Sequence, residues 1–448
     1  MKIVILALVM ITFFTIGISF AQTTVTPGNG TLQEAIIAAQ PGDVLQLIGG
    51  AEYSDDSSSI ALLDKPITIQ VEHGATQKAI VRLGDSVPSG SYYFFMIMNG
   101  ASLTLKGIEF SGLVGGTPIA KCLIKFDGNP DPANAKVGSI KIDNCVAHDF
   151  TDNLIHGFSK SSMKGMIQDS LFINNSVIYN AKTFLRYKYV SLRYMSIKNS
   201  TFYKASSYGI FFGNESDRGT EITPTAFIDH CTYNDMAPFI EVDEMSIPWT
   251  VTNCIFSNIS VPSKTGLYWS NPKIDPVVTI KNTCIWNYGG SPSSTEPLWP
   301  GYVFEDTVSV DPQYQDAANG DFTLPVGSPL LTFGTDGAAI GDPRWATNAP
   351  SGVRQAQGII PVDFILSQNY PNPFNPVTTI DFSVVKTADV KLHIYDISGA
   401  LVETVVSGEL NAGMYSVEWD ASSVSSGIYF YRLIADGKSK IRKMTLLK

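Results

Sequence analysis

The chain has 448 residues and a formal net charge of −10, from 31 Lys and Arg against 41 Asp and Glu. This length predicts two or more domains, and the acidic balance argues against nucleic acid as a partner. None of the five cysteines lies in a C-x-x-C pair, so the sequence lacks the spacing of a zinc site.

The first segment is typical of an export signal. Lys2 precedes an apolar run over residues 3–20, and Ser19 and Ala21 supply the small side chains that signal peptidase recognises. A membrane anchor is the alternative, because the run is nearly long enough to span a bilayer. We expect residues 1–21 to be a cleaved signal peptide. Because no second apolar run of this length occurs, we expect no membrane span in the mature protein.

A short helix is predicted soon after the signal. The segment TLQEAIIAAQPGD places Thr31 and Glu34 at the spacing of a capping box, and Pro41 and Gly42 follow its apolar face. Such a helix would cover the open N-terminal end of the fold that the following repeats predict.

One short sequence motif recurs through the middle of the chain. It has a turn residue between two β-rich stretches, and successive turn residues are about 23 to 31 residues apart. The turn residues are Asn144, Asn175, Asn199, His230, Asn253 and Asn282, and a weaker copy has Gly107. Gly, Asn and His accept a positive backbone φ readily, and a stacked solenoid needs one left-handed bend at a fixed point of each repeat. We predict an all-β fold, a right-handed parallel β-helix over residues 22–345, with three strands per repeat and about seven or eight coils.

A second, smaller β-domain is expected at the C-terminal end. Residues 346–361 are rich in polar residues, Pro and Gly and are predicted to be a linker. Short alternating strands with regular turn signals over residues 362–448 predict an immunoglobulin-like β-sandwich.

Both domains resemble known families. LQEAIIAAQPGDVLQL followed by GGAEY resembles the start of secreted right-handed parallel β-helix proteins such as pectate lyases and chondroitinase-B-like polysaccharide lyases. The repeats are most similar to an uncharacterised branch of this superfamily. Chondroitinase-B-like lyases present acidic metal ligands before their catalytic basic residues, whereas here Arg186 and Lys188 precede Glu241 and Asp243. The resemblance therefore implies the fold and leaves the activity to be argued from the residues.

The C-terminal domain resembles the sorting domain of the type IX secretion system. The similarity rests on NYPNPFNP at residues 369–376, on Gly413 with Trp419-Asp420, on SGIY at residues 426–429 and on a basic last strand. It implies that the type IX machinery of a Gram-negative bacterium exports the protein. It also implies that the domain is then removed, leaving the body released or attached to the surface.

The strand that opens each repeat provides a candidate binding face. Alignment of these strands gives an aliphatic column of Ile124, Ile155, Leu185, Ile210, Ile240 and Leu267, which we assign to the core. Because side chains alternate along a strand, the next position faces outward, with Lys125, His156, Arg186, Phe211, Glu241 and Tyr268. Lys188 and Asp243 lie two residues further along. The alignment predicts a groove with a basic centre, acidic residues on one side and aromatic residues between them.

Such a groove suits an acidic polysaccharide, since Arg and Lys pair with carboxylate or sulfate and aromatic rings stack on sugars. We expect Lys125, His156, Phe211 and Tyr268 to bind substrate. If the protein is a polysaccharide lyase, Arg186 or Lys188 would be the base that starts β-elimination. Glu241 and Asp243 are then the expected ligands of a Ca²⁺ ion.

Three alternatives remain open. The face can be an ordinary solvated surface with weak ion pairs, or the groove of a non-catalytic glycan-binding or adhesin-like surface protein. A glycoside hydrolase fits less well, because one Asp per coil does not form the required carboxylate pair.

The stacked repeats would also bring Cys231 and Cys254 close enough to form a disulfide. The alternative is that both are buried thiols that pack as small hydrophobic groups.

Overall fold

The structure is a computed structural model. It describes residues 21–57, 59–87, 92–98, 100–126, 136–157, 166–213, 222, 225–237, 239–243, 249–260, 268–270, 278–288, 302–325, 327–335, 337–346, 353–356, 364–369, 371–386, 388–410, 413–422 and 424–447. The signal peptide predicted for residues 1–21 therefore lies almost entirely outside the described residues.

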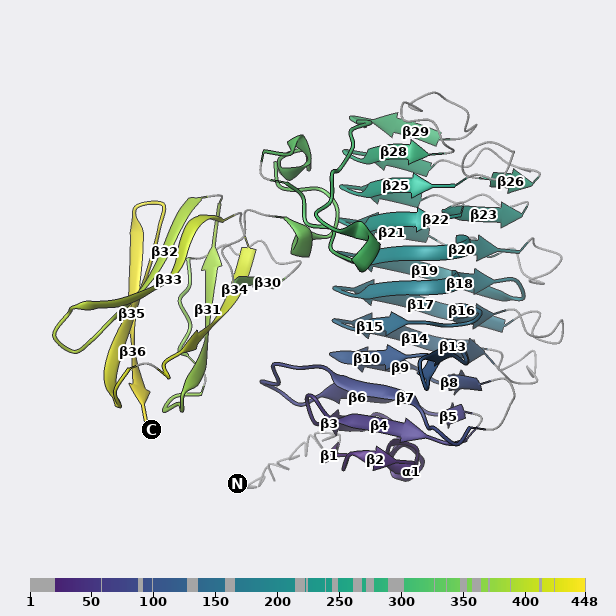
Figure 1. The fold of residues 1–448 in the computed structure, drawn as a ribbon, viewed down its shortest axis with the longest axis horizontal. Helices are drawn as coiled ribbons and strands as arrows, with labels where there is room; N and C mark the ends of the chain where they lie inside the picture. Colours follow the sequence, from purple (N-terminus) through teal and green to yellow (C-terminus); the bar gives the residue numbers. More distant parts are fainter. Residues whose placement is uncertain are drawn as a thin grey trace, which may run out of the picture.

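A parallel β-helix forms the body of the protein (Figure 1). Its first sheet has eleven parallel strands, in the order β1 (Gln22–Thr24), β3 (Val44–Leu47), β6 (Ile67–Val71), β9 (Leu103–Lys106), β14 (Lys136–Asp143), β17 (Met166–Asn174), β19 (Val190–Lys198), β21 (Thr225–Asp229), β24 (Trp249–Thr252), β27 (Val278–Lys281) and β29 (Tyr302–Glu305). Eleven strands exceed the seven or eight coils that we predicted, because the N-terminal coils lack the Asn turn that marks the later ones.

The second sheet has sixteen strands and bends around a corner of the coil. They are β2 (Gly28–Asn29), β4 (Glu52–Asp55), β5 (Ser59–Leu63), β7 (Ala79–Leu83), β8 (Tyr92–Ile97), β10 (Ile108–Ser111), β13 (Ala120–Phe126), β15 (Val146–His148), β16 (Asn153–Gly157), β18 (Val177–Tyr187), β20 (Thr201–Phe212), β22 (Thr232–Met236), β23 (Ile240–Asp243), β25 (Ile255–Ile259), β26 (Tyr268–Ser270) and β28 (Cys284–Tyr288). Strands β18 and β20 continue through the corner and join two faces of the coil into one sheet. A short hairpin of β11 (Leu113–Val114) and β12 (Thr117–Pro118) projects from the body.

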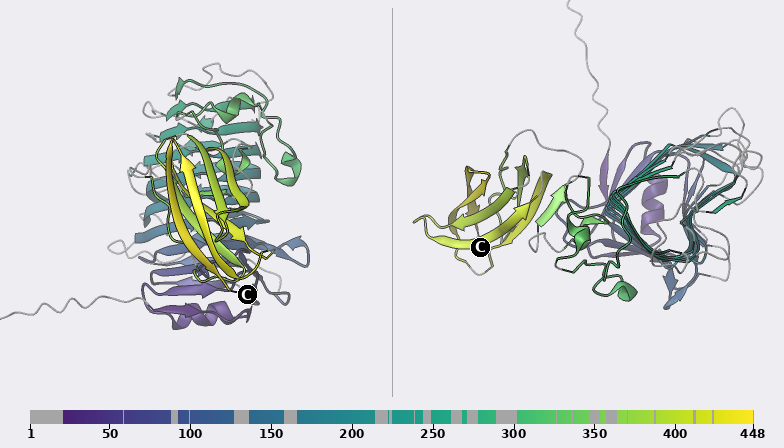
Figure 2. Two further views of the ribbon diagram at one scale, coloured as in Figure 1. Left: turned by 90° about the vertical axis from the view of Figure 1, so that its left-hand side faces the viewer. Right: turned by 90° about the horizontal axis from the view of Figure 1, so that it is seen from above.

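Helix α1 (Thr31–Ala38) lies across the N-terminal end of the coil, which is seen end-on in Figure 2. Leu32 and Ile36 are buried beneath it. The expected capping box is wrong: Gly30, with φ 76°, caps the helix, and no side chain accepts a capping hydrogen bond. Gly30 takes the left-handed conformation that disfavours other residues, so Thr31 becomes the first helical residue and donates to the Gly28 carbonyl.

The predicted turn residues are stacked from coil to coil. All six Asn and His residues have φ between 45° and 54°, and Gly107 has φ 70°. Each backbone N–H in this ladder donates to a carbonyl of the next coil at 3.0–3.1 Å, as Asn144 does to Asn174 and Asn253 to Lys281. The fold class predicted from the repeats is confirmed.

A second ladder of left-handed residues, which we did not predict, lies five residues after each of the turn residues from Asn144 onward, at the next corner of the coil. It contains Asp149, Asn180, Lys204, Asp235, Asn258 and Asn287, with φ between 49° and 62°. Asn258 Nδ2 donates to Asn234 Oδ1 at 3.0 Å, and Asn287 Nδ2 donates to Asn258 Oδ1 at 2.7 Å. Side-chain amides thus satisfy polar groups along the corner.

The interior is packed with aliphatic and aromatic side chains. Tyr233 stacks between Phe202 and Phe256, with ring centroids 5.1 and 5.0 Å away. All five cysteines are buried free thiols, as the packing alternative for Cys231 and Cys254 describes. Burial raises the pKa of the Cys145 thiol to about 11, which keeps it protonated and unreactive.

Residues 306–346, which we call the closing segment, run back over the outer side of the coil. They contain three short 3₁₀ helices, η2 (Ala317–Asn319), η3 (Pro329–Leu331) and η4 (Pro343–Trp345). Asp342, only 3% exposed, accepts from Thr201 Oγ1 at 2.7 Å and pairs with Arg344 Nε at 2.7 Å. The Asp342 N–H donates to Thr232 Oγ1 at 3.0 Å, so one residue fixes the segment to two coils.

The C-terminal domain is a two-sheet antiparallel sandwich, as predicted. One sheet has the order β30 (Val353–Ala356), β34 (Gly413–Asp420) and β31 (Val377–Val384), and the other has β33 (Leu401–Leu410), β32 (Ala388–Tyr395), β35 (Gly427–Ala435) and β36 (Lys438–Leu446). Strand β30 comes from the segment expected to be a linker and pairs with β34. The described part of the chain contains no helix with the length and apolar character needed to cross a bilayer.

His148 forms a buried charged cluster on the outer side of β15. Its Nδ1 lies 2.7 Å from Asp149 Oδ2, its Nε2 lies 3.4 Å from Glu109 Oε1, and its ring stacks on Tyr179 at 4.8 Å. Burial by itself lowers the pKa of His148, but hydrogen bonds to Glu109 and Asp149 outweigh it and leave the pKa raised. The hydrogen bond to His148 lowers the pKa of Glu109, so this carboxylate stays ionised in mild acid.

We expect His148→Gln to destabilise the fold by about 1 kcal/mol in mild acid and by less in alkali. The sign follows from the raised folded pKa, because the protonated ring stabilises fully below the unfolded value of about 6.5 and this contribution is lost as pH rises through the folded pKa. Urea unfolding of both proteins at a series of pH values checks this. An equal difference at all pH values would contradict it.

Candidate functional site

The strand register brings the aligned outward residues into one row along the coil. Lys125 lies opposite His156, and His156 lies opposite Arg186. The row continues through Phe211 and Glu241 to Tyr268, one residue per coil. The strands that carry it, β13, β16, the ends of β18 and β20, β23 and β26, form one column at the side of the body in Figure 1. We call this row the groove row.

The neighbouring aliphatic column faces the core. Ile124, Ile155, Leu185, Ile210 and Ile240 pair in register and are at most 2% exposed. Leu267, the sixth member of the predicted column, lies outside the described residues. Aliphatic residues on one side of each strand therefore fix the outward direction of the groove row.

His156 lies close to two polar side chains of its own coil. It is 9% exposed, and its Nδ1 lies 2.5 Å from Asn153 Nδ2 and 3.5 Å from Asp152 Oδ2. Asn153 is fully buried, and its Oδ1 has no hydrogen-bond partner in the described structure. An amide oxygen and nitrogen are assigned by their partners, so turning the Asn153 amide would place Oδ1 against His156 Nδ1. In that arrangement Nδ1 carries the proton and faces two acceptors, while Nε2 carries the lone pair.

Burial, helped by the neighbouring cations, favours the neutral form of His156. Burial is the main cause that lowers its pKa, to about 4, and Arg186, Lys125 and Lys121 lower it further while Asp152 opposes them. A neutral imidazole can accept a proton at the pH at which carboxylates are ionised. The geometry therefore gives His156 a chemical capacity beyond the binding role that we expected from the sequence.

The flanking cations lie against aromatic rings. Lys125 is 8% exposed, and its Nζ lies 4.3 Å from the centre of the Tyr93 ring. Arg186 Cζ lies 5.5 Å from the centre of the Phe211 ring. Such contacts hold a cation in place and keep its charge available to an anion. Lys125 and Arg186 are two coils apart, about 9.6 Å, which is comparable to the repeat of two sugars in an extended polyuronate.

The remaining predicted residues lie further along. Lys188 follows the end of β18, and its Nζ lies 5.5 Å from the Tyr189 ring. The backbones of Glu241, Asp243 and Tyr268 are described, with Asp243 opposite Ser270, but their side chains lie outside the described structure. Among the described side chains, no group of three or more His, Cys, Asp or Glu residues could hold a metal ion.

Three residues of the site escaped the sequence analysis. Asp152 and Asn153 precede His156 in the chain, and strict alternation would place Asn153 and His156 on opposite faces. Residue 153 lies at the corner, where β16 begins, so its side chain can reach the His156 ring. Tyr93 lies in a coil that lacks the Asn turn, which left it outside our alignment. The sequence DNLIH at residues 152–156, which places two polar residues shortly before His156, was the signal that could have identified Asp152 and Asn153.

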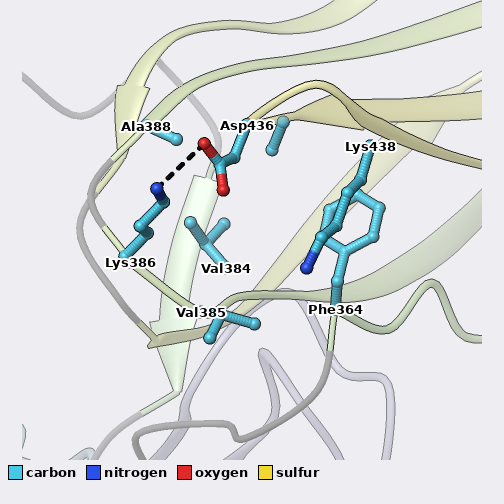
Figure 3. A pocket seen from close by; sticks show the side chains of 8 residues that line it. Phe364, Val384, Val385, Lys386, Ala388, Asp436 and Lys438 are labelled. Atoms are coloured by element: carbon cyan, nitrogen blue, oxygen red, sulfur yellow. Dashed lines mark ion pairs between the residues drawn. The ribbon is translucent and has the colours of Figure 1, made fainter.

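A pocket lies in the sandwich (Figure 3). Phe364, Val384 and Val385 supply its apolar lining, and Lys386 Nζ pairs with Asp436 Oδ1 at 3.1 Å across its rim. Both charged side chains are largely exposed. The lining is consistent with a dimple between strands of the sandwich, and we assign no chemistry to it.

Two family models match parts of the chain. Residues 368–446 match the secretion system C-terminal sorting domain, and residues 195–345 match a domain of unknown function, DUF5123. The first match confirms the resemblance of the tail and shows that the protein is exported to the cell surface or the extracellular space. The match to DUF5123 covers the C-terminal coils of the β-helix together with nearly all of the closing segment. A comparison with curated proteins finds no match.

Three of the solved structures to which the chain is similar are alginate lyases. The chain is similar to the PL6 family alginate lyase AlyGC at 17% identity, with a TM-score of 0.36 over 65% of this chain and 38% of that one. For an alanine variant of AlyGC, the identity is 17% and the TM-score is 0.40, and the match covers 68% of this chain and 40% of that one. For the alginate lyase of Paenibacillus sp. strain FPU-7, the sequence identity is 13% and the TM-score is 0.31. The match covers 60% of this chain and 96% of that one. The chain spans about two fifths of the length of AlyGC, and these similarities concern the fold alone.

Proposed function

We propose that this exported protein binds an acidic polysaccharide along the groove row and cleaves it by β-elimination at His156. The observation that carries the proposal is the position of the His156 imidazole, which the strand register places between the cations Lys125 and Arg186, with its Nδ1 close to Asp152 and Asn153. The two cations would pair with uronate carboxylates, and Phe211 and Tyr268 would contact the sugars.

The proposed reaction needs one proton acceptor and one neutralised carboxylate. Arg186 neutralises the carboxylate of the sugar that lies over His156, which makes the hydrogen on the adjacent carbon acidic. His156 Nε2 accepts that proton, a carbon–carbon double bond forms, and the bond to the departing sugar oxygen breaks. The departing oxygen takes its electron pair and then a proton from solvent. Asp152 and Asn153 hold the ring with its own proton on Nδ1.

Lys188 remains the alternative base, and Glu241 with Asp243 remain the proposed ligands of Ca²⁺. Carboxylate oxygens are the ligands that Ca²⁺ prefers, and the ion would bind the carboxylates of the polymer. None of the proton transfers above depends on the ion. Treatment with a chelator, followed by a binding measurement on oligouronate, tests this role separately from cleavage.

Incubation with pectins, alginates and glycosaminoglycans tests the function directly. We expect ultraviolet absorbance of an unsaturated uronate product to grow with at least one polymer. Arg186→Ala should lower the rate by about 10²–10³-fold, because a charge that is fixed against the developing negative charge is lost. Lys188→Ala should have a smaller effect if His156 is the base. Absence of product with every polymer would contradict the lyase.

A non-catalytic glycan-binding or adhesin-like role is the second candidate. The low exposure of His156 favours it over cleavage, because a ring that is only 9% exposed has little access to a sugar carbon, whereas the half-buried Arg186 can still pair with a carboxylate. Binding to an acidic polymer without new absorbance, lost in Arg186→Ala, would support this candidate over the lyase.

A further inference from the structure

We infer that the outer face of the first sheet carries a second glycan-binding site, an aromatic platform formed by Phe172, Tyr194 and Phe227. These residues lie on β17, β19 and β21, which are consecutive strands of that sheet (Figure 1). The proposal takes its ligand class, an acidic polysaccharide, from the proposed function, but it uses none of the residues of the groove row.

Strand alternation fixes the direction of the three rings. Leu171 and Ile173 on β17, and Ala226 and Ile228 on β21, are at most 1% exposed and face the core. Phe172 and Phe227 therefore face outward, and Phe227 is 41% exposed. The three rings form a continuous surface, since Tyr194 lies 5.6 Å from Phe172 and 6.1 Å from Phe227 between ring centroids.

The platform has the length and direction that an extended glycan requires. Phe172 pairs in register with Ser196, and Ser196 with Phe227, so the two Phe rings are two strands apart, about 9.6 Å. This distance is comparable to the length of a disaccharide. The strands of a β-helix hold the rings without a loop, so a flat sugar face can stack on them at little cost in side-chain entropy.

Charge and hydroxyl groups around the rings favour an acidic glycan as the occupant. Lys141 is exposed, pairs in register with Phe172, and places its Nζ 5.6 Å from the Phe172 ring centre. Arg193, next to Tyr194, is 51% exposed and only loosely paired with Asp169 at 3.6 Å. Ser170 Oγ donates to Ser139 Oγ at 3.0 Å beside them. Aromatic rings flanked by cations and hydroxyls match the apolar sugar faces, carboxylates and hydroxyls of a polyuronate.

The test is affinity electrophoresis of the full chain through gels that contain polygalacturonate or alginate, with dextran as the neutral control. Two backgrounds are used, the parent and a groove variant, Arg186→Ala with His156→Ala. We expect the groove variant to remain retarded by an acidic polymer. Adding Phe172→Ala, Tyr194→Ala and Phe227→Ala should raise its apparent Kd at least about tenfold. Because the three rings face outward, circular dichroism melting should show that these variants stay folded.

Charge is tested with Lys141→Glu, which should weaken retardation, and with Lys141→Arg, which should keep it. Retardation that is unchanged by the three alanines overturns the platform, whatever the groove does. Equal retardation by dextran overturns the acidic class. Loss of a dimer in size-exclusion chromatography of the alanine variant, with retardation unchanged, would assign the face to a second copy of the chain and also overturn the proposal. A different result would contradict the proposed function of the groove row: cleavage activity that survives in the Arg186→Ala, His156→Ala variant.

Discussion

His156→Ala is expected to lower kcat/KM for cleavage of an acidic polysaccharide by about 10²–10⁴-fold, the usual effect of removing a positioned general base. In the parent protein, kcat/KM should rise as pH increases through about 4, because that is where His156 loses its proton. Above that pH it should stay level until another group titrates. The pH dependence of initial rates, measured from product absorbance, checks both expectations.

His148→Ala is the matched control for His156→Ala. His148 is also buried, at 6% exposure, but it belongs to the Glu109 and Asp149 cluster outside the groove row. Its removal should leave the pH profile of kcat/KM unchanged. An activity that keeps rising into alkali and disappears in Lys188→Ala would identify Lys188 as the base and exclude His156.

Asp342→Ala is expected to reduce the free energy of unfolding of the β-helix by about 1–3 kcal/mol, the cost of leaving buried hydrogen-bond donors without their acceptor. The substitution removes the acceptor for Thr201 Oγ1 and for the Arg344 N–H, and leaves the Arg344 guanidinium without this partner. Trp345 is a local reporter, because its Nε1 donates to Thr201 Oγ1 at 2.7 Å. Urea unfolding followed by tryptophan fluorescence measures the loss.

Asp311→Ala provides the comparison for Asp342→Ala. Asp311 belongs to the same closing segment and accepts from the Gln313 N–H at 2.9 Å, but it is exposed and has no role in the Thr201 network. We expect its replacement to cost at most about 1 kcal/mol. Equal losses in the two variants would show that the buried network does not hold the closing segment against the coils.

The architecture could be predicted because the turn position imposes a backbone requirement that few residues meet. A positive φ is tolerated by Asn, Gly and His, so Asn144 and its equivalents are visible in one sequence. The second ladder was equally accessible, since Asp149, Asn180 and Asn258 each follow a turn residue at the same distance. The N-terminal coils were undercounted because their turns use other residues.

The site could be predicted only as far as alternation holds. Register places Lys125, His156 and Arg186 in a row because their strands are regular. The contact of Asn153 with His156 arises at the corner of the coil, where alternation does not apply. The pKa of His156 depends on burial and on charges from neighbouring coils, and neither is written in the local sequence.

The central claim, that an acidic glycan lies along the groove row, is tested most directly by crystals of the full chain soaked with an acidic oligosaccharide. The account predicts density that crosses β13, β16 and β18, with one carboxylate within hydrogen-bond distance of Arg186 and a sugar carbon facing His156 Nε2. The same soak into crystals of Arg186→Ala should lose that density. Sugar density that lies only on a face without Lys125, His156 and Arg186 would contradict the claim, even though the fold would stand.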